Sequence, residues 1–193
     1  MITLRPMTPA DKTMVFTWRN QPEVARYMYT DHAITLEEHE RWFASVLCDP
    51  RKRYWIIVHA GRDLGLACLT GIDLLNRRAS WAFYLGEPEQ RGKSLGGFVE
   101  YAVLEHAFNE LGLHKLCCEV LTANRTVLSL HERFGFRQEG VLREHIFKGG
   151  EFHDVICLAI TRREWEARRP DLADLLTRIE ARLARKDGGQ GSG

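Results

Sequence analysis

Long apolar segments, a strong net charge and internal repeats are all absent from this 193-residue chain. No apolar run approaches the roughly 20 residues that a membrane helix needs. The 27 basic and 26 acidic side chains leave a formal net charge of +1. This balance argues against general binding of nucleic acid, although it is compatible with a local basic site. Ile2–Arg5 reads as a strand rather than as a signal-peptide core. We therefore expect a cytoplasmic protein without a membrane partner.

The cysteines are few and do not form a recognisable framework. Their number is odd, and they are scattered through apolar segments, which favours small buried side chains that stay reduced. Adjacent cysteines on a strand point to opposite faces, and neither has a partner at ligand spacing, so we expect no metal site. The five positions are Cys48, Cys68, Cys117, Cys118 and Cys157.

A strand, a glycine-rich basic loop and a helix follow one another in the middle of the chain. Ser80–Gly86 reads as the strand, and apolar residues at helical spacing predict a helix over Ser94–Leu111. Between them, Gln90–Gly97 would place free backbone amides where a phosphate group can bind. The spacing excludes two common phosphate loops, since Glu87 stands where one of them needs its first glycine and the dinucleotide pattern is absent. On spacing alone, a solvated helix start fits equally well.

Two motifs taken together favour a phosphate-binding loop over a solvated helix start. Arg91–Gly96 resembles the Arg/Gln-x-x-Gly-x-Gly/Ala loop of the GCN5-related N-acetyltransferases (GNAT), and Asn124–Phe136 resembles their second signature. This resemblance implies an α/β fold with a mixed, mostly antiparallel central sheet, flanking helices and splayed central strands. It also implies acetyl-CoA as a co-substrate, without a metal. Two residues depart from the family pattern: Ser94 replaces a glycine, and His131 replaces a tyrosine.

The remaining chain fits one acetyltransferase domain over residues 1–165. Residues 166–193 read as a charged helical tail, interrupted by Pro170 and ending in a disordered glycine-rich terminus. Helices are expected at Asp11–Asn20, Pro22–Met28, Leu36–Cys48 and Asn124–Phe134, and strands at Ile2–Pro6, Arg53–His59, Leu64–Leu75, Ala79–Gly86, Lys115–Leu121, Phe136–Arg143 and Phe152–Ile160.

The resemblance also implies which residues hold the cofactor. Backbone amides of the loop would bind the pyrophosphate, a β-bulge in the preceding strand would present amides to the acyl oxygen, and an asparagine would contact the pantetheine arm. A regular strand with core aromatics and an ordinary helix N-cap are the structural alternatives. The implied positions are Phe83, Leu85, Arg91, Gly92, Lys93, Ser94, Leu95, Gly96, Gly97 and Asn124.

Acetyl transfer to an amine needs a base and a proton for the departing thiolate. Glu119 is the candidate base, because its apolar strand neighbours would bury it. A structural role for Glu119, paired with an arginine or capping a loop, is equally compatible, and His39 is an alternative base. His131 could protonate the thiolate in place of the family tyrosine, or the role could pass to Tyr84 or to water.

The acceptor is suggested by a narrower resemblance. Trp18-Arg19-Asn20 and His39-x-x-Trp42 resemble the branch that acetylates nucleotide-linked amino sugars in the pseudaminic acid pathway, whose substrate is a UDP-linked 4-amino-4,6-dideoxy sugar. Arg19 would then pair with the diphosphate, and Trp18 or Trp42 would stack on a ring. Taken singly, Trp42 is explained by core packing and His39 by a cap or surface position. We expect a small-molecule amine as partner, and a homodimer is compatible.

Two other functions stay open. Four acids near the second long helix, Asp31, Glu37, Glu38 and Glu40, would suit a polyamine, an aminoglycoside or a ribosomal-protein N-terminus as acceptor. A non-catalytic acyl-CoA-binding module would explain the departures at Ser94 and His131.

Overall fold

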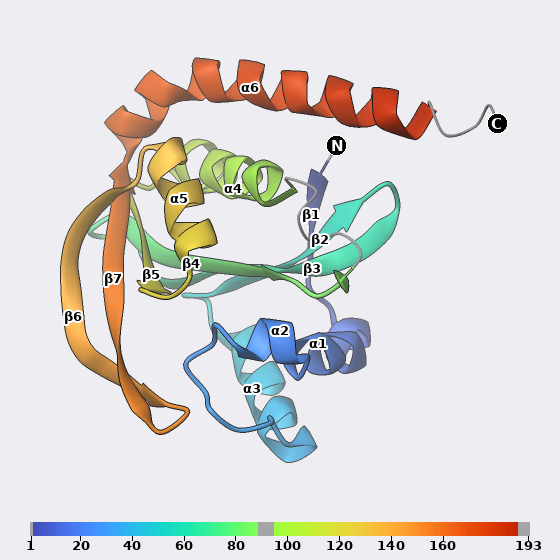
Figure 1. The fold of residues 1–193 in the computed structure, drawn as a ribbon, viewed down its shortest axis with the longest axis vertical. Coiled ribbons are helices and arrows are strands. Elements are labelled where there is room, and N and C mark those ends of the chain that lie inside the picture. Colours follow the sequence, from blue (N-terminus) through green and yellow to red (C-terminus); the bar gives the residue numbers. More distant parts are fainter. Residues whose placement is uncertain (1, 89–94, 189–193) are drawn as a thin grey trace.

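The computed structural model describes residues 2–88 and 95–188 (Figure 1). A seven-stranded sheet with the order β1-β2-β3-β4-β5-β7-β6 forms its centre. All neighbouring strands pair antiparallel except β4 and β5, which pair parallel, so the mixed, mostly antiparallel sheet expected from the sequence is confirmed. The strands are β1 Ile2–Pro6, β2 Arg53–His59, β3 Arg62–Asp73, β4 Arg78–Leu85, β5 Lys115–Leu121, β6 Arg137–Lys148 and β7 Glu151–Thr161.

Helices cover both faces of the sheet. Figure 1 shows α4, α5 and α6 on one face and α1, α2 and α3 on the other. Their bounds are α1 Lys12–Arg19, α2 Pro22–Ala25, α3 Leu36–Cys48, α4 Leu95–Glu105, α5 Arg125–Phe134 and α6 Arg162–Gly188. In the part of the chain that is described, no helix is both long and apolar enough to cross a membrane.

Each face of the sheet has its own apolar core. The larger core lies beneath α4, α5 and α6 and includes Trp81, Val103 and Trp165. The smaller core lies beneath α1 and α3 and includes Trp18 and Phe43. Successive strand residues alternate between these cores, as the two-residue period of a strand requires. This alternation fixes which side of the sheet each site residue faces.

Local signals set several element boundaries. A capping box starts α3, because Thr35 Oγ1 accepts from the Glu38 amide at 3.2 Å and Glu38 Oε2 accepts from the Thr35 amide at 2.8 Å. Asn124 caps α5, and Gly135 ends it with φ +97°. Gly71, with φ +58°, lies where the pairing of β3 with β4 shifts register. The helix positions agree with the helices expected at Leu36–Cys48 and Asn124–Phe134.

The helix after the loop ends differently from a regular α-helix. It begins at Leu95 and runs to Glu105, and His106–Glu110 then forms a π-type turn. Gly112 follows with φ +64°, which agrees with the expected end. The expected first residue, Ser94, lies outside the described residues.

The tail differs from expectation. Pro170 lies inside α6, which is continuous from Arg162 to Gly188, so the predicted interruption is wrong. Packing holds the helix together, because Leu172 and Leu176 are buried and Arg169 Nη2 lies 2.8 Å from Glu105 Oε2 of α4. The disorder predicted for the glycine-rich terminus falls largely on residues 189–193, which are not described.

The cysteines follow the expected pattern only in part. All five are free thiols, and Cys68 and Cys118 are buried. Burial raises the pKa of Cys68 to about 11, which keeps it protonated and unreactive. Cys48 is exposed at the end of α3, so the expectation of burial is wrong there.

Candidate active site

The parallel strands β4 and β5 separate after a short paired stretch. They pair only at Arg78 with Lys115, Ala79 with Leu116 and Ser80 with Cys117. Beyond this point β4 stays bonded to β3 as far as Leu85, and β5 stays bonded to β7 as far as Leu121. The central strands therefore splay apart, as expected, and leave a gap between β4 and β5.

Backbone groups of β4 face this gap. Gly86 donates its amide to the Leu64 carbonyl of β3 at 2.8 Å, so alternate residues of β4 bond towards β3. Phe83 is in the opposite phase, so its amide points away from β3 and towards β5. The β-bulge predicted at these positions is wrong, because pairing with β3 is regular from Ser80 to Leu85. Splaying, rather than a bulge, leaves an amide for an acyl oxygen.

Glu119 of β5 lies on the face of the sheet that α1, α2 and α3 cover. Its neighbours Cys118 and Val120 belong to the core on the opposite face. The Tyr29 hydroxyl, from the segment between α2 and α3, donates to Glu119 Oε2 at 2.8 Å. The carboxylate is exposed, so the expectation that its apolar neighbours bury it is wrong. Within the described part of the chain, no basic group lies within ion-pair distance of Glu119.

Tyr84 and Arg19 line the same face. Tyr84 packs with the smaller core, and burial raises its pKa above the usual value, while the charge of Arg19 opposes that shift. Arg19 donates from Nη2 to the Thr30 hydroxyl. Desolvation lowers the pKa of Arg19, with Tyr84 acting in the opposite direction. Tyr84 therefore stays protonated over the physiological range and can donate a hydrogen bond.

His131 lies on the other face, beneath α4 and α5. It is 3% exposed, and its Nδ1 lies 2.9 Å from Oε1 of Glu100, a residue of α4 that is fully buried. The imidazole contacts the ring of Trp81 edge-on, with centroids 5.2 Å apart. The two proposed proton-transfer groups, Glu119 and His131, are thus separated by the sheet at the gap.

The predicted cofactor loop is described only in part. Arg91, Gly92, Lys93 and Ser94 lie outside the described residues. Leu95, Gly96 and Gly97 form the first turn of α4, which approaches β4 and α5 closely. A Cβ at Gly96 would lie 3.1 Å from Leu130 Cδ2 and 3.4 Å from Phe83 Cζ, so this turn favours glycine. Binding of a pyrophosphate by this loop stays a prediction.

The side chain of Asn124 caps the N-terminus of α5. Its Oδ1 accepts from the Val127 amide at 3.4 Å, which is the N-cap interaction. Its contact with a pantetheine arm stays a prediction.

Most residues of the narrower resemblance have structural partners. Trp18 is 2% exposed and donates from Nε1 to Glu87 Oε1 at 2.8 Å. Asn20 bonds through both amide atoms to the backbone of Ile34, at 2.8 and 3.0 Å. Trp18 therefore cannot offer a ring face for stacking, and Asn20 fixes the chain before α3.

The α3 residues are similarly engaged. His39 is 2% exposed, and its Nε2 lies 2.8 Å from the Lys12 carbonyl, which argues against its alternative role as a base. Its predicted surface or cap position is also wrong. Trp42 packs edge-on against Tyr54, with centroids 5.4 Å apart. Arg19, which acts electrostatically on Tyr84, is the residue of these five that we retain as a candidate for contact with the acceptor.

The four acids have local partners. Glu38 completes the capping box and Glu40 lies 2.8 Å from Lys12 Nζ. Glu37 lies 3.7 Å from Arg41 Nη1, and Asp31 accepts from the Gly149 amide at 3.0 Å. Their side chains therefore have contacts with neighbouring residues in addition to any role towards a cationic acceptor. In residues 2–88 and 95–188, no group of three or more His, Cys, Asp or Glu side chains is arranged to hold a metal ion.

The hairpin of β6 and β7 holds the segment that carries Tyr29. Lys148 Nζ donates to the carbonyls of Ala25, Met28 and Thr30 at 2.7, 2.6 and 3.1 Å. Figure 1 shows this hairpin reaching down beside the connection between α2 and α3. We call these three hydrogen bonds of Lys148 the Lys148 clamp. They hold the segment that places Tyr29 over Glu119.

Sequence reasoning missed Tyr29, Glu100 and Lys148. Only Glu100 carries a local signal, because it is the sole charged residue between Leu95 and Leu104. Tyr29 and Lys148 acquire their roles through contacts between segments about 90 and 120 residues apart in the chain, as the partners at Glu119 and Met28 show. Such pairings leave no periodicity in the sequence.

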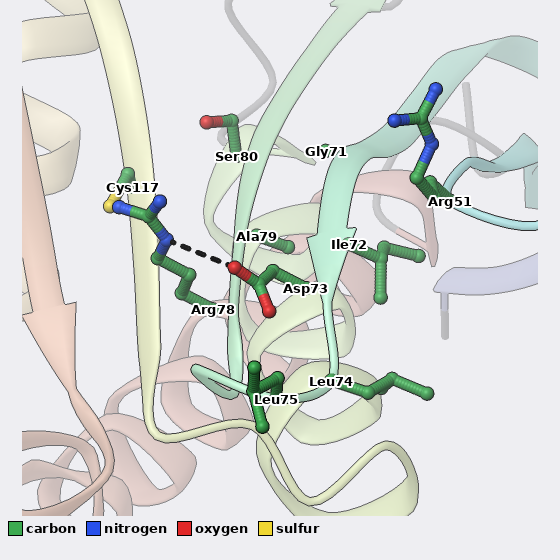
Figure 2. Close-up of a pocket in the computed structure, with 10 residues that line it drawn as sticks. All are labelled: Arg51, Gly71, Ile72, Asp73, Leu74, Leu75, Arg78, Ala79, Ser80 and Cys117. Carbon is green, nitrogen blue, oxygen red and sulfur yellow. Dashed lines mark ion pairs between the residues drawn. The ribbon is translucent and has the colours of Figure 1, made fainter.

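A pocket lies near the paired end of β4 and β5. We call the face of the sheet that carries Glu119 and is covered by α1, α2 and α3 the acceptor face, and the pocket extends it. Figure 2 shows Arg78 directed towards Asp73, with Arg51 on the opposite side. Arg78 Nε lies 3.7 Å from Asp73 Oδ2. Ser80 and Cys117 line the inner end, and Cys117 shares a strand face with Glu119.

Comparison with known proteins agrees with this geometry. Spermidine N(1)-acetyltransferase of Vibrio cholerae is 27% identical over 165 residues, covering 85% of this chain and 95% of that protein. The acetyltransferase PseH of Campylobacter jejuni is 24% identical over 139 residues, covering 70% of this chain and 85% of that protein. A crystal structure of the Vibrio cholerae spermidine N-acetyltransferase with CoA and spermine has a TM-score of 0.80 at 25% identity, covering 85% and 97% of the two chains.

A family model decides the assignment. The model described as "Acetyltransferase (GNAT) domain" matches residues 1–137, which is most of the chain. It spans the smaller core, the splayed strands and the α4–α5 layer. The chain therefore belongs to the GNAT acetyltransferase family and is an N-acetyltransferase.

Proposed function

We propose that the protein transfers an acetyl group from acetyl-CoA to a primary amine of a polyamine such as spermidine. The observation that carries this proposal is the exposed carboxylate of Glu119, which borders the gap and accepts a hydrogen bond from Tyr29. An anionic group there attracts an ammonium ion and can take up its proton. The spermidine acetyltransferases among the relatives support this acceptor.

The reaction would proceed across the sheet. The amine enters on the face of Glu119 and loses a proton to that carboxylate, directly or through water. Its lone pair attacks the thioester carbonyl, whose oxygen can accept from the amide of Phe83. The thiolate then departs on the side of α4 and α5, where His131 lies.

A nucleotide-linked amino sugar is the second candidate acceptor. The pocket with Arg51 and Arg78 favours it, because guanidinium groups bind phosphate oxygens well and would repel a polycation. PseH among the relatives also supports it. The residues originally expected to recognise the sugar support it less, since Trp18, Asn20, His39 and Trp42 have other partners.

Thiol release from acetyl-CoA would separate the candidates. We would compare spermidine, a UDP-linked 4-amino sugar, an aminoglycoside and a peptide with a free N-terminus. We expect the highest kcat/KM with spermidine. Turnover confined to the sugar would overturn the polyamine proposal, and an Arg78→Gln variant should then raise the sugar KM about 10-fold, the loss expected for one charged hydrogen bond. Tight CoA binding without turnover of any amine would instead indicate a binding module.

A further inference from the structure

The pair formed by Glu100 and His131 is a buried proton-carrying unit between two helices. Glu100 is 0% exposed and His131 is 3% exposed, and the atoms Oε1 and Nδ1 are 2.9 Å apart. The helices α4 and α5 that carry them lie side by side (Figure 1). A glutamate costs much free energy to bury, so a purely structural site would favour an apolar residue there.

The surroundings of the pair are largely apolar. Trp81 and Phe136 contact the imidazole, with ring centroids at 5.2 and 5.1 Å. Within the described part of the chain, Oε2 of Glu100 has no hydrogen-bond partner. Desolvation raises the pKa of Glu100, while His131 and the more distant Arg133 act against this shift. From β5 the group facing the carboxyl is the thiol of Cys118, which is buried.

We propose that Glu100 is a positioning residue that holds Nδ1 of His131, so that Nε2 is the nitrogen that protonates the leaving thiolate. This inference rests on the proposed function. Glu100 bonds one ring nitrogen and thereby fixes both the orientation of the imidazole and the site of its transferable proton. A tyrosine needs no such partner. The departure from the family pattern at His131 is accompanied by a buried acid at the sixth residue of α4.

The proton balance is complete. With protons on both ring nitrogens and a carboxylate on Glu100, the pair has no net charge. When the C–S bond breaks, its electron pair stays on sulfur, and the Nε2 proton forms the S–H bond. The pair is left with one negative charge and regains a proton from water. On the other face the nitrogen gives up two protons, one as the ammonium is neutralised and one after it has attacked the carbonyl, so the overall reaction from an ammonium releases one proton to solvent.

The first test measures the pair itself. In protein with 15N-labelled histidine, we expect a strongly downfield proton bonded to Nδ1 of His131, assigned by its absence in His131→Tyr. It should disappear in Glu100→Gln and persist in Glu105→Gln, a matched change on the same helix at a residue that pairs with Arg169. Absence of this signal from the unaltered protein, or its persistence in Glu100→Gln, would overturn the proposal.

The second test separates a positioning role from a structural one. We expect Glu100→Gln to lower kcat about 10-fold to 100-fold, which is typical when the residue that orients a catalytic group is lost. The affinity for CoA should not change. In a His131→Tyr background the same substitution should have no further effect. An equal loss in both backgrounds would contradict the proposal. The NMR measurement on His131 needs no turnover. If no amine is acetylated, the acceptor proposal is overturned, and the NMR signal alone then decides whether Glu100 holds Nδ1 of His131.

Discussion

The hydroxyl of Tyr29 lies 2.8 Å from Oε2 of Glu119 and joins the segment between α2 and α3 to the free edge of β5. Burial, and then the hydrogen bond to Glu119, raise the pKa of Tyr29 above its usual value. The hydroxyl therefore keeps its proton throughout the physiological range. It donates to the carboxylate and leaves the other oxygen, Oε1, available for an amine proton.

Tyr29→Phe should weaken this arrangement without abolishing catalysis. The carboxylate keeps its charge but loses one donor, so we expect kcat to fall about 5-fold, the effect of one hydrogen bond of about 1 kcal/mol. Steady-state thiol release gives the value. Tyr27→Phe is the matched control, because Tyr27 is a comparably exposed tyrosine two residues away. Equal losses in the two variants would contradict a specific contact with Glu119.

Lys148→Met should loosen the acceptor side of the site. The ammonium donates to three carbonyls of one segment, and their loss frees the backbone around Tyr29. We expect the KM for the amine to rise about 10-fold, consistent with the loss of charged hydrogen bonds, while the Kd for CoA stays constant. Lys12→Met, at an exposed pair with Glu40, is the control. An unchanged amine KM would show that the clamp does not shape the site.

Asp11 should make stability depend on acid pH. Its carboxylate accepts two hydrogen bonds from Arg5 at 2.7 and 2.9 Å, and these lower its pKa. A lowered folded pKa means that the stabilisation is complete above the unfolded value near 3.9 and is lost as pH falls through the folded value. We expect Asp11→Asn to lower the free energy of unfolding by about 2 kcal/mol at pH 7. Urea unfolding should show this difference shrinking towards pH 2; a constant difference would contradict it.

Gly86→Ala should disturb the wall of the acceptor face. A Cβ at this position would lie 2.1 Å from Cγ of Trp18, whose ring is 2% exposed and cannot move freely. We expect a loss of about 1–3 kcal/mol in unfolding free energy, as for other overpacked cores, and a change in tryptophan fluorescence. Gly140→Ala is the control, because no atom lies within 4 Å of its added Cβ. Equal stability of the two variants would refute the close packing.

The sequence predicted the fold well where local signals agree. The capping residues Thr35 and Glu38, the N-cap at Asn124 and the left-handed Gly135 all mark helix ends that the structure confirms. Alternation along β5 places Glu119 and Cys117 on the same face of the sheet. The prediction about Pro170 was wrong, because burial of Leu172 against the domain outweighs the local effect of one proline.

Side-chain environments were harder to predict. Glu119 stands in an apolar strand, yet the separation of β4 from β5 exposes it, and that separation depends on tertiary structure. His39 and Trp18 share a helical pattern with core residues, and the structure assigns both to packing. A motif can therefore indicate the family while its individual residues serve the core.

The most direct test of the account is the pH dependence of acetyl transfer in Glu119→Gln. Thiol release with spermidine would be followed from pH 6 to pH 10 in both proteins. We expect the variant to lose about 100-fold in kcat/KM at the acidic end, typical of a missing general base, and to approach the unaltered enzyme at high pH, where the amine is already neutral. Equal activity of the two proteins at every pH would show that Glu119 is not the base.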